Sequence, residues 1–197
     1  MRLEYTPPNA EDYPPDVQPL VKEITAQRAT KGVPLGPLYQ TLLISPTFAE
    51  PWYRFMQTVR YNSAVPTVYR ELSMCRVGAI NGAAYEWAHH CPLMIKAGVS
   101  EEGAETVRTA ARGEAGEGRG LTKEQWTVLR YCDAVSDLKV DDKIFSEMKD
   151  LFEGDDKKCL ELTMTITSYN AVARFLRAVD VAEMQHVEVG KGTIQHL

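Results

Sequence analysis

The chain has 197 residues, 44% of them hydrophobic and 25% charged, and a formal net charge of −5. This composition is typical of one globular domain, and the acidic balance argues against nucleic acid or an anionic membrane as the main partner. No apolar run approaches the roughly 20 residues that span a bilayer, and the first residues lack the apolar segment of a signal peptide.

Helical periodicity recurs along the chain, and no convincing strand pattern appears. Residues 1–15 contain four prolines and predict an extended N-terminal arm. Residues 16–184 predict one all-α domain, a single-domain bundle of about seven helices, and residues 185–197 a C-terminal tail. Helices are expected over ranges that include 16–29, 67–80, 141–151 and 157–181.

Several residues are expected to set helix ends. Ser100 and Thr122 each precede a periodic segment and are predicted to cap it. Asn81-Gly82 marks a break before a helix that runs to about Lys96. Pro92 is expected to kink or end that helix, because proline cannot donate the backbone hydrogen bond.

The cysteine pattern bears on location. The chain holds four widely spaced cysteines, Cys75, Cys91, Cys132 and Cys159. Without a C-x-x-C pair, they are typical of reduced, mostly buried thiols, so we expect a cytoplasmic protein. The C-terminal tripeptide Gln195–Leu197 is only loosely similar to a peroxisomal signal, which makes a peroxisomal location the alternative.

Reactive side chains concentrate between Tyr69 and Ser100. If this stretch is helical, Glu86 and His90 stand at positions i and i+4 and share one face, as do Tyr85 and His89. A carboxylate beside an imidazole is the minimum equipment for proton transfer near neutral pH. His90 is therefore the main candidate for a general acid or base.

Each member of this group also has a structural interpretation. Glu71 is either a structural partner of Arg70 or Arg76, or a carboxylate held near His90 that orients its tautomer. Glu86 is costly to bury unless it is paired, which favours a site role over a core role. The structural alternative for His90, and more so for His89, is a hydrogen-bonded core histidine.

A metal site is the least favoured interpretation of the same residues. Glu71, Glu86, His89 and His90 are all possible ligands. Adjacent histidines diverge on a helix, however, so they seldom bind one ion together. We therefore predict no metal and no cofactor.

His89 and five further residues are candidates for binding a substrate. Tyr85 and Trp87 flank the histidines, although aromatic side chains there more often serve packing. Tyr169 and Asn170 are polar in an apolar helix, which suggests that they face the same cavity. Arg174, one turn later, is placed to bind a substrate carboxylate or to form a salt bridge between subunits.

Several sequence words carry a family resemblance. They are R-E-L at 70–72, N-G-x-x-Y-E-W-A-H-H at 81–90, K-A-G-V-S at 96–100, L-x-x-S-P at 42–46 and S-Y-N-A-V-A-R-F-L at 168–176. With them the chain resembles the carboxymuconolactone decarboxylase and alkylhydroperoxidase-D-like superfamily. The resemblance implies an all-helical fold of the alkylhydroperoxidase-D-like type, a small-molecule substrate and a homo-oligomer, commonly a dimer, trimer or hexamer.

The peroxidase branch of that superfamily uses a glutamate, a C-x-x-C pair and a histidine at fixed spacing. On this chain the glutamate and histidine fall on Glu71 and His90, whereas the cysteine positions fall on Ala83 and Glu86. The chain therefore resembles a cysteine-free branch labelled carboxymuconolactone decarboxylase-like, whose chemistry is diverse.

Three hypotheses follow from the sequence. The first is a cofactor-free acid–base enzyme, a decarboxylase or isomerase, in which His90, Glu86 and Glu71 act on a small carboxylated or lactone-type molecule. The second is a thiol-dependent peroxidase or reductase that uses Cys75 or Cys91. The third is a non-catalytic helical oligomer.

Overall fold

The computed structural model describes residues 1–29 and 35–191, and this part of the chain contains helices and no strands. Its α-helices are α1 (Gln18–Ala29), α2 (Pro37–Leu42), α3 (Pro46–Tyr61), α4 (Thr67–Ile80), α5 (Ala84–Lys96), α6 (Glu101–Thr109), α7 (Lys123–Ser136), α8 (Asp142–Leu151) and α9 (Asp156–Val179). Two short 3-10 helices span Ala10–Asp12 and Val181–Glu183. The all-α prediction is confirmed. These nine α-helices exceed the expected total of about seven, because short segments such as α2 are helices of their own.

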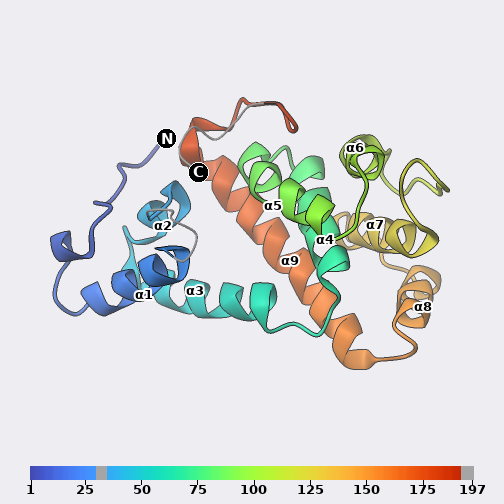
Figure 1. The fold of residues 1–197 in the computed structure, drawn as a ribbon, viewed down its shortest axis with the longest axis horizontal. Helices are drawn as coiled ribbons and strands as arrows, with labels where there is room; N and C mark the ends of the chain where they lie inside the picture. The colour runs from blue at the N-terminus through green and yellow to red at the C-terminus, as the bar shows by residue number, and fades with distance from the viewer. Residues whose placement is uncertain (30–34, 192–197) are drawn as a thin grey trace.

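Helices α4 and α9 lie at the centre of the molecule. Figure 1 shows α9 crossing between an N-terminal group, α1 to α3, and a second group formed by α6, α7 and α8. Helix α4 packs against α5, α6, α7 and α9. Residues at the start of α5 and in the middle of α9 are thereby brought to the same region as α4.

The predicted caps of two helices are confirmed. The hydroxyl of Ser100 accepts a hydrogen bond from the backbone N–H of Gly103. Thr122 and Gln125 form a reciprocal capping box at the start of α7. These contacts satisfy N–H groups that the first turn of a helix leaves without partners.

Helix α5 does not end at Pro92. It continues to Lys96 with Pro92 inside it. Proline has no N–H to donate to the carbonyl four residues earlier, so the Ala88 carbonyl lacks its usual helical partner. The chain tolerates this because Pro92 is exposed and the turns on either side of it remain helical.

A buried ion pair joins α4 to α7. Arg76 and Asp133 expose 1% and 2% of their side chains, and Arg76 Nε lies 2.6 Å from Asp133 Oδ1. The guanidinium also donates to the backbone oxygens of Val107 and Ala110, and Asp133 accepts from the N–H of Gly113. Both charges are therefore compensated inside the core.

The N-terminal arm lies against the end of α9. The backbone N–H of Arg2 donates to the Val179 carbonyl at 2.9 Å, and the terminal amine pairs with Asp180 and Glu183. The C-terminal tripeptide Gln195–Leu197, which is loosely similar to a peroxisomal signal, lies outside the described residues.

Within residues 1–29 and 35–191, no helix combines the length and the apolar character needed to cross a membrane.

Candidate active site

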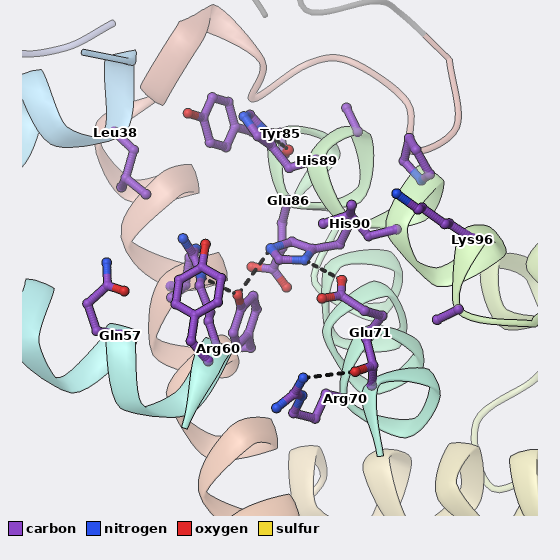
Figure 2. Close-up of a pocket in the computed structure, with 18 of the residues that line it drawn as sticks. Leu38, Gln57, Arg60, Arg70, Glu71, Tyr85, Glu86, His89, His90 and Lys96 are labelled. Atoms are coloured by element: carbon purple, nitrogen blue, oxygen red, sulfur yellow. Dashed lines mark hydrogen bonds and ion pairs between the residues drawn. The ribbon is translucent and has the colours of Figure 1, made fainter. Parts of the chain in front are cut away.

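A cavity of about 840 Å³ opens between the N-terminal helices and the α4–α5–α9 core. Its walls come from α1, α2, α3, α4, α5 and α9 (Figure 2). Most of the wall is apolar, and the polar groups gather where α3, α4, α5 and α9 meet. This combination is typical of a small-molecule site.

The main pair of reactive side chains in this cavity is Glu71 and His90. Glu71 Oε2 lies 2.7 Å from His90 Nδ1, and the two side chains expose only 12% and 8% of their surface. Glu71 comes from α4 and His90 from α5, so the packing of these helices creates the contact. The carboxylate is therefore held at the histidine, and the alternative partner Arg76 pairs with Asp133 instead.

Two more side chains extend this pair into a chain of hydrogen bonds. The Tyr169 hydroxyl lies 3.1 Å from His90 Nε2, and Arg60 Nε donates to the same hydroxyl at 2.8 Å. Arginine can only donate, so the tyrosine proton is directed to His90 Nε2. His90 then carries its own proton on Nδ1, facing Glu71. The four residues thus select one tautomer of the histidine.

The tyrosine in this chain is kept protonated by its surroundings. Tyr169 is fully buried, and burial raises the pKa of its phenol above the usual value, although the charge of Arg60 acts in the opposite direction. At neutral pH its hydroxyl is therefore a donor to His90 and an acceptor from Arg60.

Glu86 lines the same cavity but differs from Glu71 in its hydrogen bonding and protonation. It shares a helix face with His90, as predicted, but no hydrogen bond joins the two residues. Its side chain is buried, and neither carboxyl oxygen has a hydrogen-bond partner among the described residues. Burial raises the pKa of Glu86 well above its usual value, against the opposing charge of Arg60. A carboxyl group buried without a partner in this way favours its neutral, protonated form.

Cations dominate the charges on the cavity wall. Arg60, Arg70 and Lys96 line it together with Glu71 and the neutral Glu86. Arg70 donates to the Ser63 carbonyl and to the Thr67 hydroxyl, which are both uncharged. With Glu71 engaged by His90, the cavity carries a surplus of positive charge.

The other predicted binding residues divide into two groups. Tyr85 and His89 line the cavity, with their ring centroids 4.3 Å apart. Trp87, Asn170 and Arg174 are not among the described residues that line it. Trp87 is buried in the core, and on an ideal helix it lies roughly opposite His89, which is two residues later.

Asn170 and Arg174 have structural contacts instead of a place in the cavity. The amide of Asn170 bonds Asn81 on one side and Ser136 on the other. Arg174 is exposed and donates to the carbonyl and the side-chain oxygen of Asn170. One helical position separates Asn170 from Tyr169 and turns it towards α4 and α7. A role of Asn170 and Arg174 in binding substrate stays a prediction.

The four cysteines are free, and none is among the described residues that line the cavity. Burial raises the pKa of Cys75 well above its usual value and also raises the pKa of Cys91. A raised pKa leaves less thiolate at neutral pH. In the described part of the chain, no group of three or more histidine, cysteine or acidic side chains is arranged to hold a metal ion.

Arg60 was not among the residues predicted from the sequence. It stands four residues after the buried Met56, on the inner side of α3. A cation on the apolar face of an amphipathic helix is a usable signal, since burying it requires a partner. Its actual partner, Tyr169, is 109 residues away in the chain, which no local pattern reveals.

Two comparisons with known proteins found a similarity. The structure is similar to the crystal structure of an uncharacterized peroxidase-related protein from Silicibacter sp. TM1040, with a TM-score of 0.68, 14% sequence identity, and coverage of 92% of this chain and 94% of that chain. No curated protein matches the chain. Residues 46–121, which include Arg60, Glu71, Glu86 and His90, match the model of the carboxymuconolactone decarboxylase family.

Proposed function

We propose that this protein is a cofactor-free acid–base enzyme, a decarboxylase or isomerase, that acts on a small carboxylated or lactone-type molecule. The observation that carries the proposal is the hydrogen bond between Glu71 and His90 in the wall of a large cavity. A carboxylate that accepts from Nδ1 fixes the imidazole and stabilises its protonated form. The match to the decarboxylase family over residues 46–121 supports the same reaction class.

His90 is the general base and, after it has taken a proton, the general acid. Its Nε2 accepts the substrate proton once the Tyr169 hydroxyl releases its hydrogen bond, and the resulting imidazolium is paired with Glu71. In isomerisation, a C–H bond breaks, the proton moves to Nε2, and the electron pair moves onto the substrate carbonyl. The same proton then returns to another carbon.

Decarboxylation uses the same groups in the reverse order. The bond between the substrate carbon and its carboxylate breaks, carbon dioxide leaves, and the electron pair moves onto the carbonyl oxygen. His90, which takes up a proton from solvent on Nε2, then gives that proton to the carbon. Neither route requires an external oxidant or reductant, because the substrate carbonyl accepts the electrons and returns them.

The charges of the cavity favour an anionic substrate. Arg60, Arg70 and Lys96 line the wall, and Glu71 is already engaged by His90. A carboxylate would therefore be attracted to the cavity, and its mainly apolar wall would receive the rest of the molecule.

Proton exchange with solvent tests the proposal before the natural substrate is known. A panel of carboxylated γ-lactones and enolisable carboxylic acids is incubated with the protein in heavy water, and NMR follows the loss of C–H signals and the release of carbonate. His90→Gln should slow the exchange by about 10²- to 10⁴-fold. His186→Gln is the matched control, because His186 is exposed and does not line the cavity.

Two results would contradict the proposal. One is that no compound of the panel exchanges faster with the wild-type protein than in buffer. The other is that His90→Gln and His186→Gln exchange equally fast although both remain folded. The second result would return His90 to the role of a hydrogen-bonded core histidine.

A thiol-dependent peroxidase is the second candidate. It is favoured by the structural similarity to the peroxidase-related protein from Silicibacter. The raised pKa of Cys91 and of Cys75 gives it less support, because a peroxidase needs a thiolate. The double variant Cys75→Ala/Cys91→Ala separates the two candidates. It should abolish thiol-dependent reduction of hydrogen peroxide if the peroxidase is correct, and leave lactone exchange unchanged if the acid–base enzyme is correct.

The family resemblance also leads us to propose a homo-oligomer. Helix α3 exposes Phe48, Phe55 and the neighbouring Ile44, which supports an apolar contact between copies. A non-catalytic oligomer of this kind is the remaining alternative, and it predicts that neither the exchange assay nor the peroxide assay detects turnover.

A further inference from the structure

Two polar side chains of the cavity are not used by the Glu71–His90 pair. Arg60 enters from α3 and Glu86 from α5, and both line the space next to His90 (Figure 2). They also lie within electrostatic reach of each other, since the charge of Arg60 acts on the carboxyl group of Glu86. A ligand in the cavity can therefore meet both groups at once.

Arg60 presents free hydrogen-bond donors in a fixed direction. Its Nε donates to the Tyr169 hydroxyl at 2.8 Å, and its guanidinium lies over the Tyr169 ring, 5.8 Å from the centroid. Within the described part of the chain, its two terminal nitrogens have no hydrogen bond and no ion pair. The guanidinium is planar, so fixing Nε and the ring contact also fixes the direction of the terminal N–H groups.

Glu86 is a buried acid whose carboxyl group has no hydrogen-bond partner among the described residues. Only 2% of the residue is exposed, and both carboxyl oxygens lack partners among the described residues. Leaving such a group unpaired destabilises the folded protein. A neutral carboxyl group has an O–H to donate, and Glu86 is one of the residues that line the cavity. An unpaired buried donor in a cavity wall points to a ligand oxygen.

On the basis of the proposed function, we propose that Arg60 and Glu86 are catalytic residues that together bind the enolate oxygen of the reaction. Arg60 donates a terminal N–H and Glu86 donates its O–H to the same substrate oxygen. When the C–H or C–carboxylate bond breaks, the electron pair moves onto this oxygen, and both hydrogen bonds become stronger. Arg60 and Glu86 keep their own protons, and His90 alone transfers the substrate proton.

This arrangement explains why the cavity holds two differently charged carboxyl groups. Glu71 stabilises the positive charge that forms on His90, and the neutral Glu86 can stabilise the negative charge that forms on the substrate. Both charges of the transition state, the positive charge on His90 and the negative charge on the substrate oxygen, would then be stabilised. Hydrogen-bond donors placed for a developing oxyanion contribute about 10²- to 10³-fold each to the rate.

The binding of 4-nitrophenol tests the enolate site without turnover. Its planar ring carries one ionisable oxygen, and the ionised form absorbs visible light, so absorbance reports the charge of the bound probe. We expect the wild-type protein to bind the ionised form at a pH at which the free probe is mostly neutral. Arg60→Gln should weaken binding of the ionised form at least tenfold and abolish this shift.

Variants of Glu86 distinguish its hydrogen bond from simple packing. Glu86→Gln keeps an N–H donor of similar shape and should retain most of the shift. Glu86→Leu keeps the size and removes the donor, and it should reduce the shift. Arg174→Gln is the control for loss of a cation, since Arg174 is exposed and does not line the cavity. If Arg60→Gln does not fold, Arg60→Lys, which lacks the guanidinium fork, should also reduce the shift.

Several outcomes would overturn the inference. They are failure of the wild-type protein to bind 4-nitrophenol, binding of the neutral phenol alone, and a shift that survives Arg60→Gln or Glu86→Leu. His90→Gln separates this inference from the proposed function, because it should abolish exchange and keep the shift. A shift that is lost in His90→Gln and kept in Arg60→Gln would assign the ionisation to the histidine instead.

Discussion

His90 Nδ1 and Glu71 Oε2 lie 2.7 Å apart on two helices that follow each other in the chain, and the two residues are 19 positions apart in the sequence. The contact is almost removed from solvent, and the second nitrogen of the same ring is held by Tyr169. Both ring nitrogens are therefore bonded within the protein, and the charge state of the ring depends on both partners.

Replacing the carboxylate should change the pH dependence of the reaction. Glu71→Gln keeps a hydrogen-bond acceptor for Nδ1 and removes the negative charge that favours the protonated ring. We expect proton exchange to slow by about tenfold or more, and the ascending limb of its pH profile to move to lower pH. The measurement is the exchange rate in heavy water between pH 5 and 9. An unchanged profile would exclude an electrostatic role for Glu71.

Removing the Tyr169 hydroxyl should allow His90 to adopt both of its neutral tautomers. In Tyr169→Phe, His90 Nε2 loses its donor and Arg60 Nε loses its acceptor. Nitrogen-15 NMR should show His90 as the Nδ1–H tautomer in the wild-type protein and as a mixture in the variant. Buried groups left unpaired should lower the free energy of unfolding by about 1–3 kcal/mol. The same single tautomer in both proteins would contradict the directional chain of hydrogen bonds.

The neutral state of Glu86 should make the protein less stable at alkaline pH. A carboxyl group whose pKa is raised on folding keeps its proton in the folded state while the unfolded chain loses it, so stability is highest below the unfolded value and falls as pH rises towards the folded value. The slope for one such group is at most about 1.4 kcal/mol per pH unit. Glu86→Gln should remove this loss, as measured by urea unfolding between pH 4 and 9.

The control for this stability experiment is Glu50→Gln. Glu50 is an exposed glutamate on α3. Its replacement should leave the pH dependence of the wild-type protein unchanged. If Glu86→Gln and Glu50→Gln show the same pH dependence as the wild-type protein, Glu86 is ionised in the folded state and cannot be a neutral donor.

Breaking the buried ion pair of the core should be much more costly than breaking one at the surface. Asp133→Ala leaves the Arg76 guanidinium buried without its carboxylate, and we expect a loss of about 3–5 kcal/mol in the free energy of unfolding. Glu23→Gln, which breaks the exposed pair with Arg54, should have little effect. Denaturant unfolding of both variants measures the difference, and comparable small losses would show that the core pair is not needed.

The helices and their ends follow mainly from local signals, which is why the sequence could predict them. Ser100 and Thr122 cap helices as expected, because capping depends on residues within one turn. Pro92 misleads as a stop signal, since one missing hydrogen bond can be tolerated inside α5 when packing holds its two ends.

The contacts of the site were predictable only where its residues share a local motif, although Tyr169 was expected in the cavity because it is polar in an apolar helix. Glu71 and His90 fall in one stretch with family-like spacing, and the structure brings them together. Arg60 and Tyr169 come from helices far away in the sequence, and only the packing of α3 on α9 joins them. The orientation of Asn170 depended on a single helical position, which the polarity pattern of α9 does not resolve.

The position of Arg60 on α3 links ligand binding to local stability. The Glu71–His90 pair lies on α4 and α5, whereas the cation that we propose to hold the substrate oxygen reaches the cavity from α3. A state in which α3 detaches would keep the acid–base pair and lose the anion site. A ligand bound by Arg60 must then stabilise α3 against local opening. The free energy of this stabilisation equals the part of the ligand's binding energy that depends on α3. Amide hydrogen exchange along α3 would therefore report occupancy of a cavity whose reactive groups lie on other helices.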